Sequence, residues 1–319
     1  MPFVEVKKKS EGTKFLFYGE AGSGKTPTGL SFPNIALVDA DSGSNFYDLS
    51  NVVVTTSALS YKELEEDLDE LEMDDELFDS IQTFVVDSIS RLHETLSVAM
   101  NKVAERRAVS AGREAEAELL SFREYGKMKT YYEEFYGRMV GYAKMGKHLV
   151  FIAEQKDKTE NINGEIRKVG VMPNAQKDIE YDFDVVVRTF QEETVIDGKK
   201  VRVPKGIVLK DRTGTFNVGE IIDKPHYNLW KDAVERALKG ERRTKNEIKT
   251  VRDAAEEEIA MIDDGETLRK KALEIIKKLD NEQKLKAKEV LIETIGTYEV
   301  QKLSDVKKLQ AAIKALETL

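Results

Sequence analysis

Short runs of apolar residues alternate with helical patterns in the N-terminal part of the chain. Three of these runs have the length and composition of buried strands, at positions 15–18, 35–39 and 148–153. A fourth run, Thr83-Phe84-Val85-Val86-Asp87-Ser88, carries an acidic residue near its end. Helical spacing of apolar residues fills most of the intervals between the runs. This alternation predicts an α/β fold with a mostly parallel sheet flanked by helices.

Turn residues predict two β-hairpins further along the chain. Asn163-Gly164 and Asp197-Gly198 are dipeptides that favour the two-residue turns of antiparallel strands. After the second hairpin the pattern changes to a charged stretch and then to amphipathic helices. We therefore expect a core domain at 1–240, a charged linker at 241–264 and a small helical C-terminal region at 265–319.

The turn after the first strand has the composition of a phosphate-binding loop. It matches the pattern G-x-x-x-x-G-K-[ST], in which glycines let successive backbone N–H groups point at phosphate oxygens. Lys25 is expected to reach the β- and γ-phosphates, and the Thr26 hydroxyl to hold Mg²⁺. ATP and Mg²⁺ are the expected cofactors, and a glycine-rich turn that binds nothing is the alternative. The expected nucleotide-binding residues are Gly19, Glu20, Ala21, Gly22, Ser23, Gly24, Lys25, Thr26 and Pro27, since proline is tolerated in a first helical turn.

Polar side chains near the ends of later strands supply further candidates. Asp87 ends a buried strand and has the position of an aspartate that orients a metal-bound water, so we expect it to act in the Mg²⁺ site with Thr26. Gln155 follows the strand at 148–153, where a polar side chain can sense the γ-phosphate. Lys210 and Arg212 are two residues apart on a strand, so they project from one face and can meet the nucleotide of a neighbouring subunit.

Composition excludes several kinds of site. The chain has no cysteine, which excludes disulfides, thiolate metal sites and a cysteine nucleophile. The three histidines, His93, His148 and His226, lack the spacing of metal ligands. We recognise no signal peptide and no apolar run that could span a bilayer. The expectation is a soluble cytoplasmic protein that does not bind a membrane.

The net charge of −9 is concentrated in one segment. Eleven acidic residues and one lysine lie between Ser60 and Ser80, so the rest of the chain is close to neutral and has room for a basic face. Leucines at helical spacing among these acids indicate a helix with a solvated acidic surface. A polyanionic partner would have to bind well away from this segment.

Two basic regions are candidates for contact with nucleic acid. The first lies in a helical part and contains Arg106 and Arg107, and the second is a predicted loop with Lys156, Lys158, Arg167 and Lys168. Aromatic and charged residues alternate between 122 and 145. We expect these aromatics to pack against the sheet, with a base-stacking surface as the alternative. They are Phe122, Tyr125, Tyr131, Tyr132, Phe135, Tyr136 and Tyr142.

These motifs together resemble the ATPase core of RecA-type recombinases, over roughly residues 14–239. The chain is most similar to phage ATPases of the Sak-type group, which act as single-strand annealing proteins. The resemblance implies that Asp41 activates the attacking water, that Gln155 senses the γ-phosphate, and that Lys210 and Arg212 reach across a subunit interface. The family usually has glutamate at the position of Asp41, which favours slow turnover.

The resulting hypothesis is an ATP-dependent protein that binds and anneals single-stranded DNA and hydrolyses ATP between subunits. We expect a homo-oligomer, as a ring or a short filament, in the cytoplasm of the host cell if a phage encodes the chain. The C-terminal helices are expected to dock on the core or on a replication or repair protein. The alternatives are a nucleotide-gated scaffold without appreciable hydrolysis and, less favoured, a small-molecule kinase with the same phosphate loop.

Overall fold

The computed structural model describes residues 8–112, 120–196, 199–244, 247–248, 251–303 and 305–317. These residues form two compact units, Met1–Ile248 and Lys249–Leu319, which we describe separately. The predicted hairpin turn at Asp197-Gly198 lies outside the described residues. Helix α7 (Val251–Lys278) begins inside the segment that we expected to be a linker.

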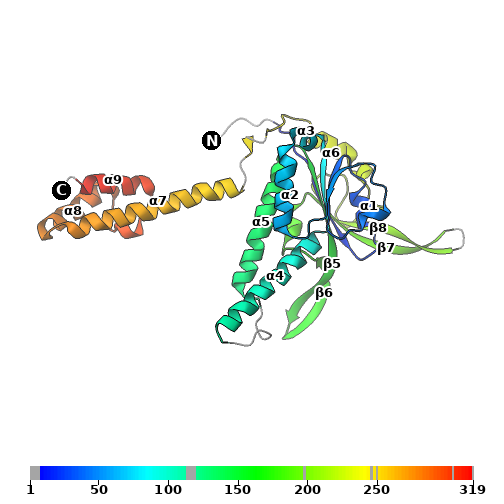
Figure 1. Cartoon of the computed structure of the whole chain (residues 1–319), viewed down its shortest axis with the longest axis horizontal. Helices are drawn as coiled ribbons and strands as arrows, with labels where there is room; N and C mark the ends of the chain where they lie inside the picture. The colour runs from blue at the N-terminus through cyan, green and yellow to red at the C-terminus, as the bar shows by residue number, and fades with distance from the viewer. Residues whose placement is uncertain are drawn as a thin grey trace. The chain divides into compact units, whose positions relative to one another are not determined.

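Within the described residues of the first unit, nine strands form one sheet in the order β3-β2-β4-β5-β1-β7-β8-β9, with β6 paired to β5 (Figure 1). Neighbouring strands from β3 to β7 run parallel, whereas β6, β8 and β9 pair antiparallel. The predicted α/β fold with a mostly parallel sheet is therefore confirmed. The strands are β1 (Lys14–Gly19), β2 (Ile35–Asp39), β3 (Val52–Thr56), β4 (Thr83–Asp87), β5 (His148–Ile162), β6 (Glu165–Pro173), β7 (Val185–Ile196), β8 (Lys199–Asp211) and β9 (Ile221–Asp223).

The central strands are apolar on both faces because helices cover both sides of the sheet. Leu16 and Tyr18 of β1 belong to the core beneath helices α2 (Tyr61–Met73) and α5 (Phe122–Lys144). Phe15 and Phe17, which alternate with them, belong to the opposite core. That second core lies beneath α1 (Lys25–Gly29) and α6 (Lys231–Ala237) and includes the fully buried Trp230.

The acidic segment between Ser60 and Ser80 forms helices α2 and α3 (Asp75–Ser80). Ser60 caps α2 by accepting a hydrogen bond from the Glu63 N–H, and Leu64 and Leu68 are buried against the sheet. The segment therefore has the predicted arrangement, with leucines inward and most carboxylates toward solvent.

Three antiparallel pairs of elements extend outward from the sheet (Figure 1). Helix α4 (Ile89–Ser110) leaves the end of β4, and α5 returns along it. Strand β5 continues past Gln155 and pairs with β6, with Asn163 and Gly164 at positive φ in the predicted turn. The segment that we predicted as a basic loop is thus largely a β-hairpin. Strands β7 and β8 form the third projection.

The second unit has its own small core, formed by helices α7, α8 (Asn281–Ile295) and α9 (Val306–Leu316). Asp280 and Gln283 form a capping box at the start of α8, and Gly296 ends this helix with a φ of 79°. Leu291, Leu309 and other apolar residues on the facing sides of these helices are buried together. The sequence-based expectation of amphipathic helices in this region agrees with the structure.

Candidate nucleotide-binding site

The residues between Gly19, which ends β1, and Lys25, which begins α1, form a tight loop. Gly22 and Gly24 have φ angles of 73° and 90°, which side chains rarely tolerate. A Cβ on Gly19 would lie 2.1 Å from the carbonyl oxygen of Thr189, so only glycine fits against β7. The loop therefore has the backbone that the phosphate-loop pattern predicts.

The Lys25 ammonium group is folded back over this loop. Its Nζ donates to the carbonyl oxygens of Gly19 and Glu20, at 3.1 and 2.7 Å. Burial lowers the pKa of Lys25, although nearby carboxylates including Asp87 oppose this effect. A partly buried ammonium that has carbonyl oxygens as hydrogen-bond partners is suited to gain a phosphate as counter-charge.

Thr26 and Asp87 come together from different elements of the fold. The Thr26 hydroxyl donates to Oδ2 of Asp87 over 2.6 Å, which brings the start of α1 to the end of β4. Burial raises the pKa of Asp87 to about 6, and the hydrogen bond from Thr26 acts in the opposite direction. A cation at this position would relieve the unfavourable burial of the carboxylate.

Asp41 lies just beyond the end of β2 and both of its carboxylate oxygens have partners. Ser88 donates to Oδ2 at 2.9 Å, and the Arg91 guanidinium donates to Oδ1 at 2.8 Å. The neighbouring Asp39 has a different role. Its carboxylate accepts hydrogen bonds from the N–H groups of Gly43 and Ser44 and so stabilises the turn that follows β2. These two bonds fix the position of the Asp41 carboxylate, and each of its oxygens keeps a lone pair that can accept a hydrogen bond from a water.

Gln155 connects strand β5 to the phosphate loop. Its Nε2 donates to Oε1 of Glu20 over 3.1 Å. The strands agree with this connection, since Glu154 on β5 lies beside Gly19 on β1 in the parallel ladder. A polar side chain thus stands between the loop and the β5–β6 hairpin.

Lys210 and Arg212 lie near the opposite end of the sheet from the phosphate loop. Lys210 is paired with Val186, whereas Gly206, further back on β8, is paired with Thr189 beside Gly19. The Lys210 ammonium donates to the carbonyl oxygens of Glu180 and Tyr181, and the Arg212 guanidinium lies 3.5 Å from Asp184. The structure therefore does not bring this pair to the loop of its own chain.

The residues at the loop fit a nucleoside triphosphate with Mg²⁺. Lys25 and the loop backbone would hold the phosphates, and Thr26 and Asp87 would hold the metal. Among the described residues there is no cluster of three or more histidine or carboxylate side chains placed to hold a metal alone. When bound, Mg²⁺ supplies positive charge that stabilises the phosphoryl group.

Two residues of the β7–β8 hairpin also contact the loop, and sequence analysis missed them. Gln191 donates to the Gly22 carbonyl over 2.5 Å, and a Cβ on Gly24 would lie 2.9 Å from Pro204. The two residues face each other across the hairpin. Neither has a sequence signal, because both contacts depend on how the hairpin folds over the loop. Ser88 and Arg91 were also missed, although they directly follow the predicted Asp87 strand.

The basic residues predicted to contact nucleic acid lie on the α4–α5 pair and on the β5–β6 hairpin. These two projections extend in similar directions in Figure 1. Arg106 is exposed on α4, whereas Arg107 pairs with the buried Glu124 at 2.6 Å. On the β5–β6 hairpin, Arg167 pairs with Glu165, and Lys168 with Asp157. Lys156 and Lys158 are exposed and make no ion pair within the described residues. Arg106, Lys156 and Lys158 are therefore the cations that remain most available to a phosphate backbone.

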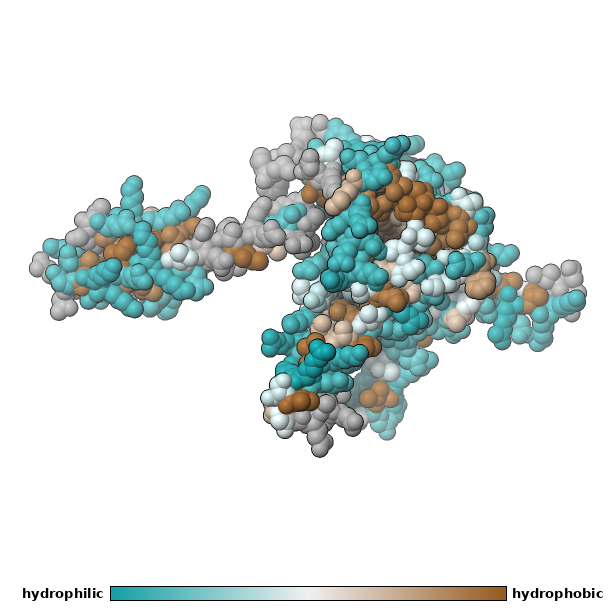
Figure 2. Space-filling view, viewed as in Figure 1, coloured by the Kyte–Doolittle hydropathy of each residue, from teal (hydrophilic) through white to brown (hydrophobic). Residues whose placement is uncertain are grey.

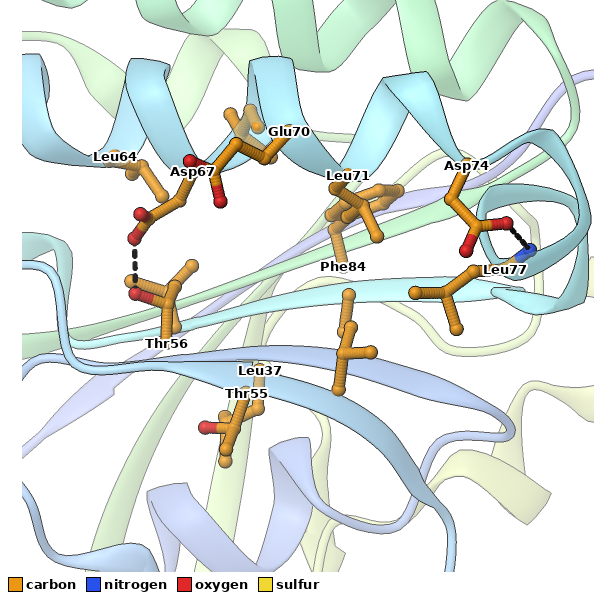
Figure 3. A pocket seen from close by; sticks show the side chains of 14 residues that line it. Leu37, Thr55, Thr56, Leu64, Asp67, Glu70, Leu71, Asp74, Leu77 and Phe84 are labelled. Atoms are coloured by element: carbon orange, nitrogen blue, oxygen red, sulfur yellow. Dashed lines mark hydrogen bonds between the residues drawn. The ribbon is translucent and has the colours of Figure 1, made fainter.

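A separate cavity of ≈ 440 Å³ lies between α2 and strands β2, β3 and β4 (Figure 3). Leu64, Leu71 and Phe84 provide apolar lining, and Asp67 and Glu70 provide carboxylates. The cavity lining does not include any residue of the phosphate loop. We therefore do not assign the nucleotide to it.

Comparison with protein families agrees with the geometry of the loop. In the part of the chain that the structure describes, every helix is too short or too polar to cross a bilayer. No curated protein matches the sequence at a significant level. The family model described as AAA domain matches residues 11–216, which include the loop, Asp41, Asp87 and Gln155. The chain therefore belongs to the AAA domain family of P-loop ATPases.

Proposed function

We propose that the chain is an ATPase that binds and anneals single-stranded DNA under the control of ATP, as in the phage Sak-type ATPases that its sequence resembles. One observation carries this proposal. Strand β5 runs from the sheet beside Gly19 into an exposed hairpin that bears Lys156 and Lys158. A change at the phosphate loop can therefore reach a cationic projection through a single strand.

Gln155 is the residue that we propose for this coupling. Its bond to Glu20 joins the loop to the first residue pair of the β5–β6 hairpin, Gln155 and Pro173. A γ-phosphate near Gln155 would compete with Glu20 for the amide group, which would change the hairpin at its base. Binding through Lys156 and Lys158 would be independent of DNA sequence and sensitive to salt.

We also propose that the ATPase works between subunits. Lys210 and Arg212 lie away from the loop of their own chain, so a role for them in hydrolysis requires another protomer. Positive charge from them would stabilise the transition state on the neighbouring nucleotide. A ring or a short filament provides this arrangement, and the second unit remains available to bind a replication or repair protein.

The test measures DNA binding and ATP turnover with the full chain. We expect a labelled 30-nucleotide single strand to bind, with higher affinity when a non-hydrolysable ATP analogue and Mg²⁺ are present, and to stimulate phosphate release. Gln155→Ala should retain ATP and DNA binding but lose their mutual effect, whereas Gln310→Ala, at an exposed position of α9, serves as a matched control. Absence of binding to single strands at low salt would overturn the proposal.

One observation favours a nucleotide-gated scaffold as the second candidate function. Both oxygens of Asp41, the proposed base, are held by Ser88 and Arg91. If these bonds hold the carboxylate away from the attacking water, the site would bind ATP without efficient hydrolysis. Undetectable phosphate release by a protein that binds ATP, with and without single-stranded DNA, would support the scaffold over the DNA-stimulated ATPase.

A further inference from the structure

The tip of the α4–α5 hairpin exposes two aromatic rings that the core does not use. Tyr132 and Phe135 of α5 are buried, as expected for aromatics that pack against the sheet. Phe122, by contrast, is 97 % exposed and Tyr125 is 56 % exposed. Tyr131, further along the helix, is also 47 % exposed, so the tip carries the most exposed rings and the rings near the sheet are mostly buried.

The two exposed rings share one face of α5. Phe122 and Tyr125 are three residues apart, and Lys129 follows four residues later, so all three lie along the same side of the helix. Gly126 also borders this side, and a Cβ placed on it would contact nothing within 4 Å. The absence of a side chain there leaves room for a flat group beside the rings.

An ion pair with a buried carboxylate lies at the base of the tip. Glu124 is 3 % exposed in its side chain, and it accepts from Arg107 of α4 at 2.6 Å. Glu124 also forms a capping box with Ser121 at the start of α5. Because these contacts fix the first turn of the helix, Phe122 is presented outward on an ordered element.

The charge around the rings is positive although the chain as a whole is acidic. In the described residues 101–112 and 120–130, six cations accompany two acids. Residues 113–119 lie outside the described part and contain one arginine and three glutamates, so the sequence from 101 to 130 has a net charge of +2. The exposed cations are Lys102, Arg106, Arg123, Lys127 and Lys129.

This combination of exposed rings and cations fits single-stranded nucleic acid better than another protein. Protein interfaces are depleted of lysine and bury a continuous patch with an apolar centre. Figure 2 shows that the end of the core that carries α4, α5 and the β5–β6 hairpin is mostly hydrophilic, with small separate hydrophobic patches. Proteins that bind single strands use aromatic rings for the bases and cations for the phosphates.

We infer that Phe122 and Tyr125 form a base-stacking platform for single-stranded nucleic acid, with Arg106 and Lys127 contacting the phosphate backbone. The inference rests on the proposed function and extends it, because the paired part of the β5–β6 hairpin, residues 155–173, supplies cations but no aromatic side chain. The α4–α5 tip would supply the stacking surface that this hairpin lacks.

The test compares variants of the full chain by fluorescence anisotropy with a labelled single strand and a duplex of the same length. The double variant Phe122→Ala/Tyr125→Ala should lose at least about fivefold in single-strand affinity and much less in duplex affinity. Phe122→Tyr should retain binding, because it keeps a ring. Tyr181→Ala removes a 77 % exposed ring from the segment after β6 and should change nothing.

The dependence of affinity on salt separates stacking from phosphate contact. Arg106→Ala should reduce the slope of log affinity against log salt by about 0.7, whereas the double aromatic variant should keep the wild-type slope. A single strand that contains 2-aminopurine should report quenching with the wild type and not with the double variant.

The outcomes distinguish this inference from the proposed function. If the wild type does not bind single strands, the proposed function fails and the inference fails with it. If the wild type binds but the double variant binds equally well with the same quenching, only the inference is overturned. A double variant that dissociates an oligomer in sedimentation and leaves DNA binding unchanged would show that the rings contact a second copy of the chain.

Discussion

Thr26 and Asp87 are 61 positions apart in the chain, and their side chains are joined by a hydrogen bond of 2.6 Å. The bond is possible because β1 and β4 both end at the same edge of the parallel sheet, one on each side of β5. The loop that follows β1 therefore meets the carboxylate that ends β4. This pair is the centre of the candidate nucleotide site.

The variant Lys25→Ala should weaken nucleotide binding by about 10- to 100-fold, because it removes a charged hydrogen bond to the phosphates. Isothermal titration with an ATP analogue and Mg²⁺ measures the effect. Lys62→Ala removes an exposed lysine that pairs with Glu66 on α2 and serves as the control. Unchanged affinity in Lys25→Ala would contradict the assignment of the phosphate loop.

The Mg²⁺-dependent part of nucleotide affinity should depend on pH through Asp87. The folded-state pKa of Asp87 is raised to about 6, so a proton competes with the metal as the pH falls below this value. We expect the effect of Mg²⁺ to fall about tenfold per pH unit below pH 6 and to be constant above pH 7. Asp87→Asn should abolish this dependence, whereas Asp48→Asn, an exposed carboxylate outside the site, should retain it. Full Mg²⁺ dependence at pH 5 would contradict the prediction.

Stability should decrease in mild acid because of His148. Burial lowers the pKa of this imidazole to about 4, and its Nδ1 accepts a hydrogen bond from the Thr13 N–H. In the unfolded chain the His148 imidazole binds a proton below about pH 6.5, whereas in the folded protein it stays neutral down to about pH 4. The free energy of unfolding therefore decreases as the pH falls through this interval and levels off below it. The loss is on the order of 3 kcal/mol.

The variant His148→Asn tests this prediction, because asparagine keeps an acceptor for the Thr13 N–H and does not titrate. Urea unfolding between pH 4 and 7 should show a smaller loss of stability in this variant than in the wild type. His226→Asn changes an exposed imidazole and serves as the control. Equal losses in all three proteins would contradict the role of His148.

Breaking the ion pair between Arg107 and Glu124 should loosen the α4–α5 tip. Arg107→Ala leaves the Glu124 carboxylate without its cation and removes the ion pair between α4 and the first turn of α5. Hydrogen exchange should become faster in the last turns of α4 and the first turns of α5. Arg106→Ala removes the exposed neighbour and should leave exchange unchanged. Identical exchange in both variants would show that the ion pair does not order the tip.

The strands were predictable because their apolar runs are continuous and bounded by turn residues. The runs at 35–39 and at Thr83 to Asp87 agree with β2 and β4, and β1 extends one residue beyond each end of the predicted run. The phosphate loop was equally predictable, because its eight residues are consecutive in the chain and its glycines are required by the backbone geometry of the loop. The family match confirms that the chain is a P-loop ATPase.

The contacts between distant segments were not predictable from the pattern. Gln191 and Pro204 rest on the phosphate loop only because the β7–β8 hairpin bends over it, and nothing in their sequence environment indicates this. Arg107 was a candidate for contact with nucleic acid, and the structure pairs it with Glu124. A charge count along the chain does not reveal which charges neutralise each other in space.

The sequence by itself determined the α/β sheet and the phosphate loop, because hydrophobic periodicity and glycine geometry act between residues that are close in the chain. The tertiary structure alone decided which of the aromatics of α5 are buried and which are exposed, since this depends on where the helix leaves the sheet. It also decided that Asp41 is held by Ser88 and Arg91 and that Gln155 meets Glu20. These relations arise from the packing of segments that are far apart in the chain, whose positions are fixed when the whole sheet forms.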